Sequence, residues 1–187
     1  MVPVSYLYGI DTVRESIEDE YIGKFARHFI FDEVVPTINL PKDEMEFFAS
    51  SVLERYLNPF VRHELMSIAL NSISKYKARV LPTVKDYYEK FGKLPNCAIF
   101  SLAALIKFYF GKRNDENINL KDDPSYLSFF NELKNANLDS KDVVIKVLSN
   151  KDMFGEDLTL IGDLLDKTIK YFDLINKNGM KKSILRP

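Results

Sequence analysis

Four polar residues recur at helical spacing in the stretch 58–82, NPFVRHELMSIALNSISKYKARVLP, which the periodicity of its apolar residues predicts to be one long helix. They are His63, Ser67, Asn71 and Ser74. Hydroxyl, amide and imidazole groups can hydrogen-bond a polar ligand, whereas solvent-facing helix surfaces are usually filled with Lys and Glu. Lys75 borders this polar stripe and could pair with an anionic group of a ligand. Taken alone, the residues favour the simpler alternative, in which the stripe contacts a neighbouring helix.

The other residues that could bind a metal or take part in catalysis do not have the spacing that several common kinds of site require. Two histidines and the single cysteine, Cys97, are far apart in the sequence, so no zinc-binding spacing exists and no intrachain disulfide can form. The adjacent acids at 32–33 and 122–123 do not suggest glycosidase chemistry. His28 is expected on the surface. The seven glycines are scattered singly, outside any phosphate-binding loop, so we expect no metal site and no nucleotide loop in this chain.

Composition narrows the class of protein further. The 187 residues carry 26 basic and 27 acidic side chains, a net charge of -1, which does not suggest binding to nucleic acid or to an anionic membrane. The most apolar run, residues 98–106, is much shorter than the roughly 20 residues that a membrane span requires. A lone cysteine fits a reducing compartment, and no secretory leader opens the chain, so we expect a cytoplasmic protein.

The pattern of apolar residues predicts an all-α domain of about eight helices, with no parallel sheet between them. The run 96–111, NCAIFSLAALIKFYFG, is apolar nearly all round and should be the central buried helix. Asp11 is a candidate cap for a short helix at 12–19, and residues 113–123 read as a surface loop. The other expected helices cover 20–36, 41–56, 59–82, 83–91, 124–135, 140–148 and 156–177.

The stretch 58–82, with VPVSYLYGIDTV before it and FGEDLT after it, resembles the C-terminal domain of the mannitol dehydrogenase family of polyol-specific long-chain dehydrogenases. Within that family it is most similar to the uronate branch, the tagaturonate reductases or altronate oxidoreductases. The resemblance implies NAD-dependent, metal-independent hydride transfer between D-tagaturonate and D-altronate. It also implies that an N-terminal Rossmann domain holds NAD while the helical domain closes over the sugar acid.

The same resemblance implies which part of the enzyme this chain supplies. The family's catalytic motif, a Lys, four residues, an Asn, two residues and a His, should precede Met1. We therefore expect residues 1–187 to be a helical substrate-binding domain without the Rossmann domain, without catalytic residues and without turnover of its own. No cofactor is expected to bind this chain alone, and NAD is expected in the complete enzyme.

Given the resemblance, we expect the polar stripe to form one wall of a uronate-binding site rather than a contact with a neighbouring helix. Lys75 matches a lysine that the family places near the substrate, and Asn71 stands beside it. Ser67 falls where polyol-acting members carry an arginine, and His63 where they carry an aspartate. Replacing an aspartate by a histidine removes a negative charge beside a carboxylate-bearing substrate, which is electrostatically favourable.

Two other interpretations remain open. The chain could be a stand-alone helical interaction module that has kept the fold and lost the chemistry, or part of an enzyme for mannonate or mannitol. If another domain normally packs against it, one surface should be unusually apolar and the isolated chain should self-associate. We expect that surface near the Met1 end and the polar stripe that contains His63.

Overall fold

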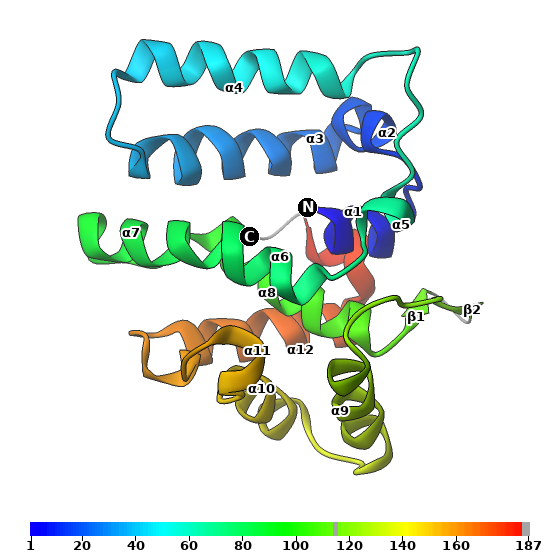
Figure 1. The fold of residues 1–187 in the computed structure, drawn as a ribbon. Helices are drawn as coiled ribbons and strands as arrows, with labels where there is room; N and C mark the ends of the chain where they lie inside the picture. The colour runs from blue at the N-terminus through cyan, green and yellow to red at the C-terminus, as the bar shows by residue number, and fades with distance from the viewer. Residues whose placement is uncertain (114–115, 185–187) are drawn as a thin grey trace.

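The computed structural model describes residues 1–113 and 116–184, which form an almost entirely helical domain (Figure 1). The elements are α1 (Val2–Tyr8), α2 (Val13–Glu18), α3 (Glu20–Arg27), the π-helical η1 (His28–Val34), the 3₁₀ turn η2 (Val35–Thr37), α4 (Lys42–Tyr56), α5 (Leu65–Ile68), α6 (Ser72–Arg79), α7 (Leu81–Phe91), α8 (Asn96–Tyr109), β1 (Lys112–Arg113), β2 (Glu116–Asn117), α9 (Pro124–Asn135), α10 (Ser140–Leu148), α11 (Lys151–Phe154), the 3₁₀ turn η3 (Leu158–Leu160) and α12 (Leu164–Ser183). The predicted all-α class is confirmed.

Helix α8 is the centre of the hydrophobic core, as its sequence predicts. Nearly all of its residues are buried, and it packs most extensively against α12 and also against α1. A helix without a polar face must bury its whole circumference, which places it inside the molecule. None of the helices in the described residues combines the length and the apolar character that crossing a bilayer requires.

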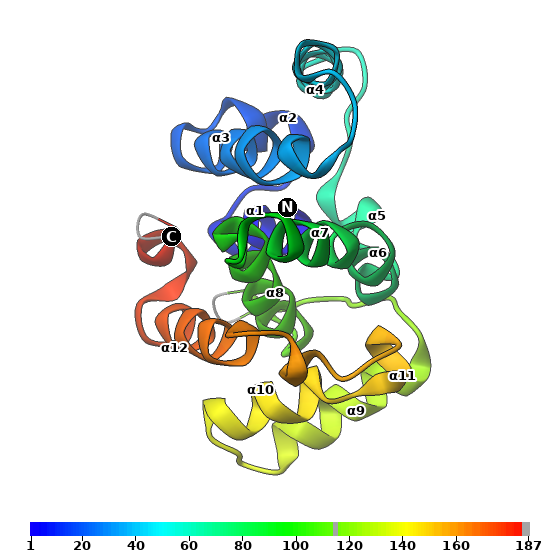
Figure 2. The ribbon, with the colours of Figure 1, turned by 90° about the vertical axis from the view of Figure 1, so that its left-hand side faces the viewer.

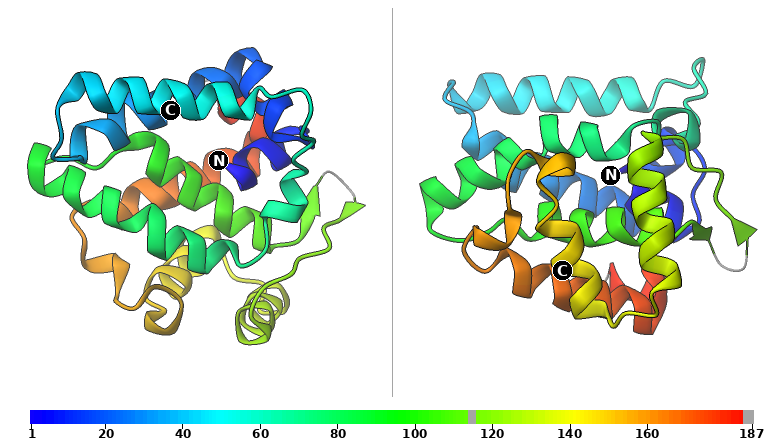
Figure 3. Two further views of the ribbon diagram at one scale, coloured as in Figure 1. Left: turned by 45° about the horizontal axis from the view of Figure 1, so that its top comes forward. Right: turned by 60° about the horizontal axis from the view of Figure 1, so that its bottom comes forward.

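The other helices cover α8 on opposite sides. Helix α4 forms one outer layer and the pair α9 and α10 the other, with α8 between them (Figures 1 and 2). When the top of the molecule is turned forward, α4 lies in front of α3; when the bottom is turned forward, α9 and α10 lie in front (Figure 3). Helix α4 is anchored by a small separate cluster of buried apolar residues, Ile17, Ala26 and Leu53.

The predicted long helix at 58–82 is wrong: its first residues are not helical, and the rest is divided among α5, α6 and the start of α7. Residues 57–64 contain no helix, and Asn71 adopts a left-handed conformation (φ 54°) between α5 and α6. Backbone groups here bond to distant segments instead: the Leu65 N–H donates to the Asp11 carbonyl (2.8 Å) and the Asn71 N–H to the Lys121 carbonyl (3.2 Å). Asparagine tolerates left-handed backbone better than most residues do. Pro82 lies in the first turn of α7, where its missing N–H costs nothing.

Several boundaries also differ from the sequence prediction. The segment before Gly9 is a helix, α1, although no cap signals its start. Thr12, and not Asp11, caps α2. The last long helix starts at Leu164 rather than at 156. Gly179 is non-helical (φ 73°, ψ 165°), so α12 consists of two helices that meet at a kink there, and the first of them ends close to the predicted position. In the predicted loop 113–123, residues 114–115 lie outside the described residues, and β1 pairs with β2 in antiparallel register.

Candidate functional site

The members of the predicted polar stripe lie on two short helices and the segments beside them rather than on one helix. They are His63 before α5, Ser67 in α5, Asn71 at the break and Ser74 in α6. All four are exposed, so they do not form a contact inside the helical core. The simple alternative of a buried helix contact is therefore not supported, and the stripe faces outward, where another molecule or domain can reach it.

Lys75 is fixed at the junction between α5 and α6. Its Nζ donates a hydrogen bond of 2.7 Å to the carbonyl of Ile68, the last residue of α5, and the side chain is partly buried. An ammonium has three donors, so two remain for a ligand. The hydrogen bond therefore holds a positive charge near Asn71 without using up its binding capacity.

A buried tyrosine of α8, itself hydrogen-bonded to an aspartate, contacts this junction from the core side. The hydroxyl of Tyr109, in α8, accepts the N–H of Ile73 (3.3 Å) and donates to the carboxylate of Asp122. Burial and the neighbouring Asp122 both raise the pKa of Tyr109, so the hydroxyl stays protonated. Sequence reasoning did not find this pair, because 36 residues separate Tyr109 from Ile73 and no local pattern links them.

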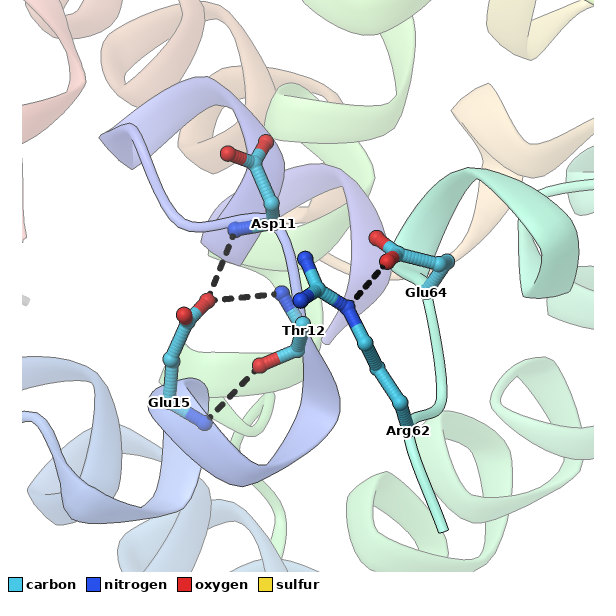
Figure 4. Close-up of polar contacts among 5 residues, drawn as sticks. All are labelled: Asp11, Thr12, Glu15, Arg62 and Glu64. Atoms are coloured by element: carbon cyan, nitrogen blue, oxygen red, sulfur yellow. Dashed lines mark hydrogen bonds and ion pairs between the residues drawn. The ribbon is translucent and has the colours of Figure 1, made fainter.

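A second polar cluster fixes the segment that leads into α5 against the turn between α1 and α2. Figure 4 shows the Glu15 carboxylate reaching back to the backbone N–H groups of Asp11 (3.4 Å) and Thr12 (3.0 Å), and Arg62 pointing at Glu64. The Thr12 hydroxyl accepts the Glu15 N–H (3.2 Å), which completes a capping box. Hydrogen bonds to the Glu15 carboxylate, from the Thr12 side chain first and then from the backbone of Thr12 and Asp11, lower the pKa of Glu15. Thr12 and Glu64 also form an isolated β-bridge, so the cluster positions the approach to the polar stripe.

The one cysteine is part of a structural contact. Glu33 is buried, and its two carboxylate oxygens accept the N–H groups of Cys97 (2.6 Å) and Ala98 (2.9 Å) at the start of α8. Burial and the nearby Glu33 carboxylate raise the pKa of the Cys97 thiol, which makes it a poor nucleophile. Within residues 1–113 and 116–184, no group of three His, Cys, Asp or Glu side chains is arranged to hold a metal ion.

Comparison with known proteins identifies the class to which this helical domain belongs. Residues 1–173 match the family described as the mannitol dehydrogenase C-terminal domain, and the chain belongs to that family. The fold agrees: the structure superimposes on mannitol 2-dehydrogenase of Pseudomonas fluorescens, solved with NAD and D-mannitol, with a TM-score of 0.84 at 17% identity, covering 100% of this chain and 38% of that one. A D-sorbitol dehydrogenase gives a TM-score of 0.78 at 22% identity, covering 98% of this chain and 37% of that one.

Curated relatives narrow the comparison to one branch. Altronate oxidoreductase of Yersinia pestis is 37% identical over 188 residues, and that of Klebsiella pneumoniae (strain 342) is 38% identical over 188 residues. Each alignment covers 98% of this chain but 39% of the relative. The chain thus spans about two-fifths of the length of the curated relatives it matches.

Proposed function

We propose that this chain is the substrate-binding C-terminal domain of an NAD-dependent oxidoreductase that interconverts D-tagaturonate and D-altronate. The observation that carries the proposal is the 37% identity to altronate oxidoreductases across 98% of the chain. The break between α5 and α6 adds a physical reason, because it presents exposed hydrogen-bonding groups next to a lysine fixed by its own hydrogen bond.

In this proposal the chain binds and orients the sugar acid. Lys75 pairs with the carboxylate, and His63, Ser67 and Asn71 hydrogen-bond the hydroxyl groups of the open-chain sugar acid. We assign none of its residues to NAD, because its glycines stand singly and form no phosphate-binding loop. We assign none to catalysis, because the resemblance places the Lys-Asn-His motif before Met1. NAD, held by a Rossmann domain outside these 187 residues, would supply the hydride chemistry in the complete enzyme.

Substitution of Lys75 tests the site. We expect Lys75→Met to weaken D-altronate binding at least about tenfold, because a charge-assisted hydrogen bond contributes about 1.5–3 kcal/mol. Titration calorimetry of the chain with D-altronate, D-mannonate and D-mannitol measures both the loss and the preference for a uronate. Lys146→Met on the exposed face of α10 is the matched control and should bind as the unmodified chain does. Equal affinities of the two variants for D-altronate would show that Lys75 does not contact the ligand.

Turnover is a separate test of the chain's role. Mixed with NADH and D-tagaturonate, the chain alone should oxidise no NADH, because the proposal places hydride transfer and proton transfer on other residues. Robust turnover by the isolated chain would contradict that division of labour and leave the sugar-acid site intact.

A stand-alone helical interaction module is the second candidate, and exposed aromatic side chains such as Phe47 and Phe60 favour it. The DNA upstream of the Met1 codon separates the two candidates. An in-frame segment that encodes a glycine-rich loop and a Lys-Asn-His motif supports the oxidoreductase, whereas non-coding sequence supports the module.

A further inference from the structure

Helix α6, which carries Lys75, is capped by a distant part of the chain. Within the described residues, the side chain of Asn71, which precedes the helix in left-handed backbone, makes no capping hydrogen bond. The first N–H groups of a helix have no acceptor inside it and need one from elsewhere. In α6 the buried Ile73 N–H donates to the hydroxyl of Tyr109 in α8 (3.3 Å). The core helix α8 therefore supplies an acceptor that Asn71 does not.

The segment before α9 holds the same end of α6. Asp122 accepts the hydroxyl proton of Tyr109. A hydroxyl has one proton, so the Tyr109 oxygen is left with its lone pairs for the N–H groups of α6. One residue before Asp122, the Lys121 carbonyl accepts the Asn71 N–H (3.2 Å). The start of α6 is thus attached both to α8 and to the segment that leads into α9.

The position of Lys75 depends on this start. Its N–H donates to the Asn71 carbonyl (3.0 Å), which closes the first turn of α6, and its Nζ donates to the Ile68 carbonyl (2.7 Å) at the end of α5. The lysine therefore bridges the break between the two helices. Helix ends fray readily, and fraying of this first turn would shift the backbone of Lys75 relative to α5. The ammonium would then leave the place where the Ile68 carbonyl holds it.

We propose that Tyr109 and Asp122 are positioning residues: they hold Lys75 where it pairs with the carboxylate of a sugar acid, and so favour a uronate over an uncharged polyol. The inference rests on the proposed function. Tyr109 is 1% exposed, so it acts on the ligand only through α6. A charge-assisted hydrogen bond weakens steeply as its geometry departs from the ideal, so a displaced ammonium loses affinity for the carboxylate. A polyol makes no such bond.

Removal of one hydroxyl tests the pair. Tyr109→Phe deletes the hydroxyl and keeps the ring that packs on Phe130 (4.8 Å between ring centroids). We expect the variant to bind D-altronate at least about fivefold more weakly in titration calorimetry, the loss that corresponds to one hydrogen bond. Tyr76→Phe is the matched control. Tyr76 is a buried tyrosine of α6 itself, but its hydroxyl donates to the Ala98 carbonyl (3.0 Å), away from the first turn, so its loss should leave the affinity unchanged.

Further variants and a ligand-free measurement separate positioning from general support of the fold. Asp122→Asn keeps an acceptor oxygen and should retain the affinity, whereas Asp122→Ala should lose as much as Tyr109→Phe. In chains that already carry Lys75→Met, Tyr109→Phe should cost no further affinity, because it acts through the ammonium. The NMR resonance of the Lys75 ammonium should move toward those of exposed lysines such as Lys146 in Tyr109→Phe, and should stay in place in Tyr76→Phe.

Three outcomes contradict the proposal. Equal losses of affinity in Tyr109→Phe and Tyr76→Phe would show a general effect of destabilisation. A loss that persists in the Lys75→Met background would show that Tyr109 acts through another group. An unmoved Lys75 resonance in Tyr109→Phe would show that the pair does not hold the ammonium. Absence of D-altronate binding by the unmodified chain would contradict the proposed function instead, and the resonance would still report whether the pair holds Lys75.

Discussion

At the scale of single residues, Glu33 connects two distant parts of the molecule. It belongs to the π-helical η1, and it caps the buried helix α8 by accepting two backbone N–H groups. The N-terminal end of a helix carries a partial positive charge, which stabilises a carboxylate placed there. No residue of α8 itself supplies this cap: the helix begins after Pro95, whose side chain caps nothing.

Removing this carboxylate should destabilise the fold. We expect Glu33→Ala to lower the free energy of unfolding by about 2–4 kcal/mol, because each buried N–H group left without an acceptor costs about 1–3 kcal/mol. Urea unfolding followed by circular dichroism measures the change. Asp32→Ala is the matched control: Asp32 is exposed and pairs with His28, and its loss should cost less than about 1 kcal/mol. Similar costs for both variants would show that Glu33 does not anchor α8.

Glu33 also predicts a pH dependence of stability. Burial raises the pKa of its carboxyl above the ordinary value of 4.5, although the hydrogen bonds from Cys97 and Ala98 oppose this. The folded state then binds the proton of Glu33 more tightly than the unfolded state does. The stability gained from this tighter proton binding is complete below pH 4.5 and is lost as the pH rises through the raised pKa. Relative to Glu33→Gln, which does not titrate, the unmodified chain should lose stability over that window in pH-series urea unfolding. A constant difference would contradict the raised pKa.

At the scale of elements, the break between α5 and α6 depends on the left-handed conformation of Asn71 (φ 54°). We expect Asn71→Val to cost about 1–3 kcal/mol, because a β-branched residue is strained in that conformation. Asn71→Gly adopts it without strain and should keep the stability near that of the unmodified chain. Thermal unfolding separates the two variants.

The glycine variant also tests the proposed sugar-acid site without disturbing the break. If the Asn71 amide contacts the ligand, Asn71→Gly should bind D-altronate at least about fivefold more weakly, the loss expected for one hydrogen bond of about 1 kcal/mol. Calorimetry on the folded variant measures it. Unchanged affinity would reduce the role of Asn71 to shaping the break.

At the scale of the whole molecule, the core is divided unequally. One large cluster surrounds α8, whereas α4 rests on the small cluster of Ile17, Ala26 and Leu53. We expect amides of α4 to exchange with solvent on the order of 100-fold faster than those of α8, because α4 can open without unfolding the large cluster. Native-state hydrogen exchange measures this. Leu53→Ala should speed exchange in α4 and leave α8 nearly unchanged, and equal effects on both helices would show that the domain opens as one unit.

The sequence by itself determined the helical class, the burial of α8 and the family. These depend on local periodicity, on composition and on a long stretch of matching residues, all of which can be read along the chain. A run such as 96–111 has no polar face, so no other placement than the interior was open to it.

Only the tertiary structure decided how the candidate site is built. The apolar residues of 58–82 repeat at helical spacing, yet backbone groups there bond to Asp11 and Lys121, and the helix breaks into separate pieces. The caps and supports have the same origin: Glu33 meets Cys97 across 64 residues, and Tyr109 meets Ile73 across 36. Such bonds join groups that are neighbours only after folding, and periodicity reports only which side of a helix is apolar. The identities of the polar residues were therefore visible in the sequence, whereas their placement on separate segments was not.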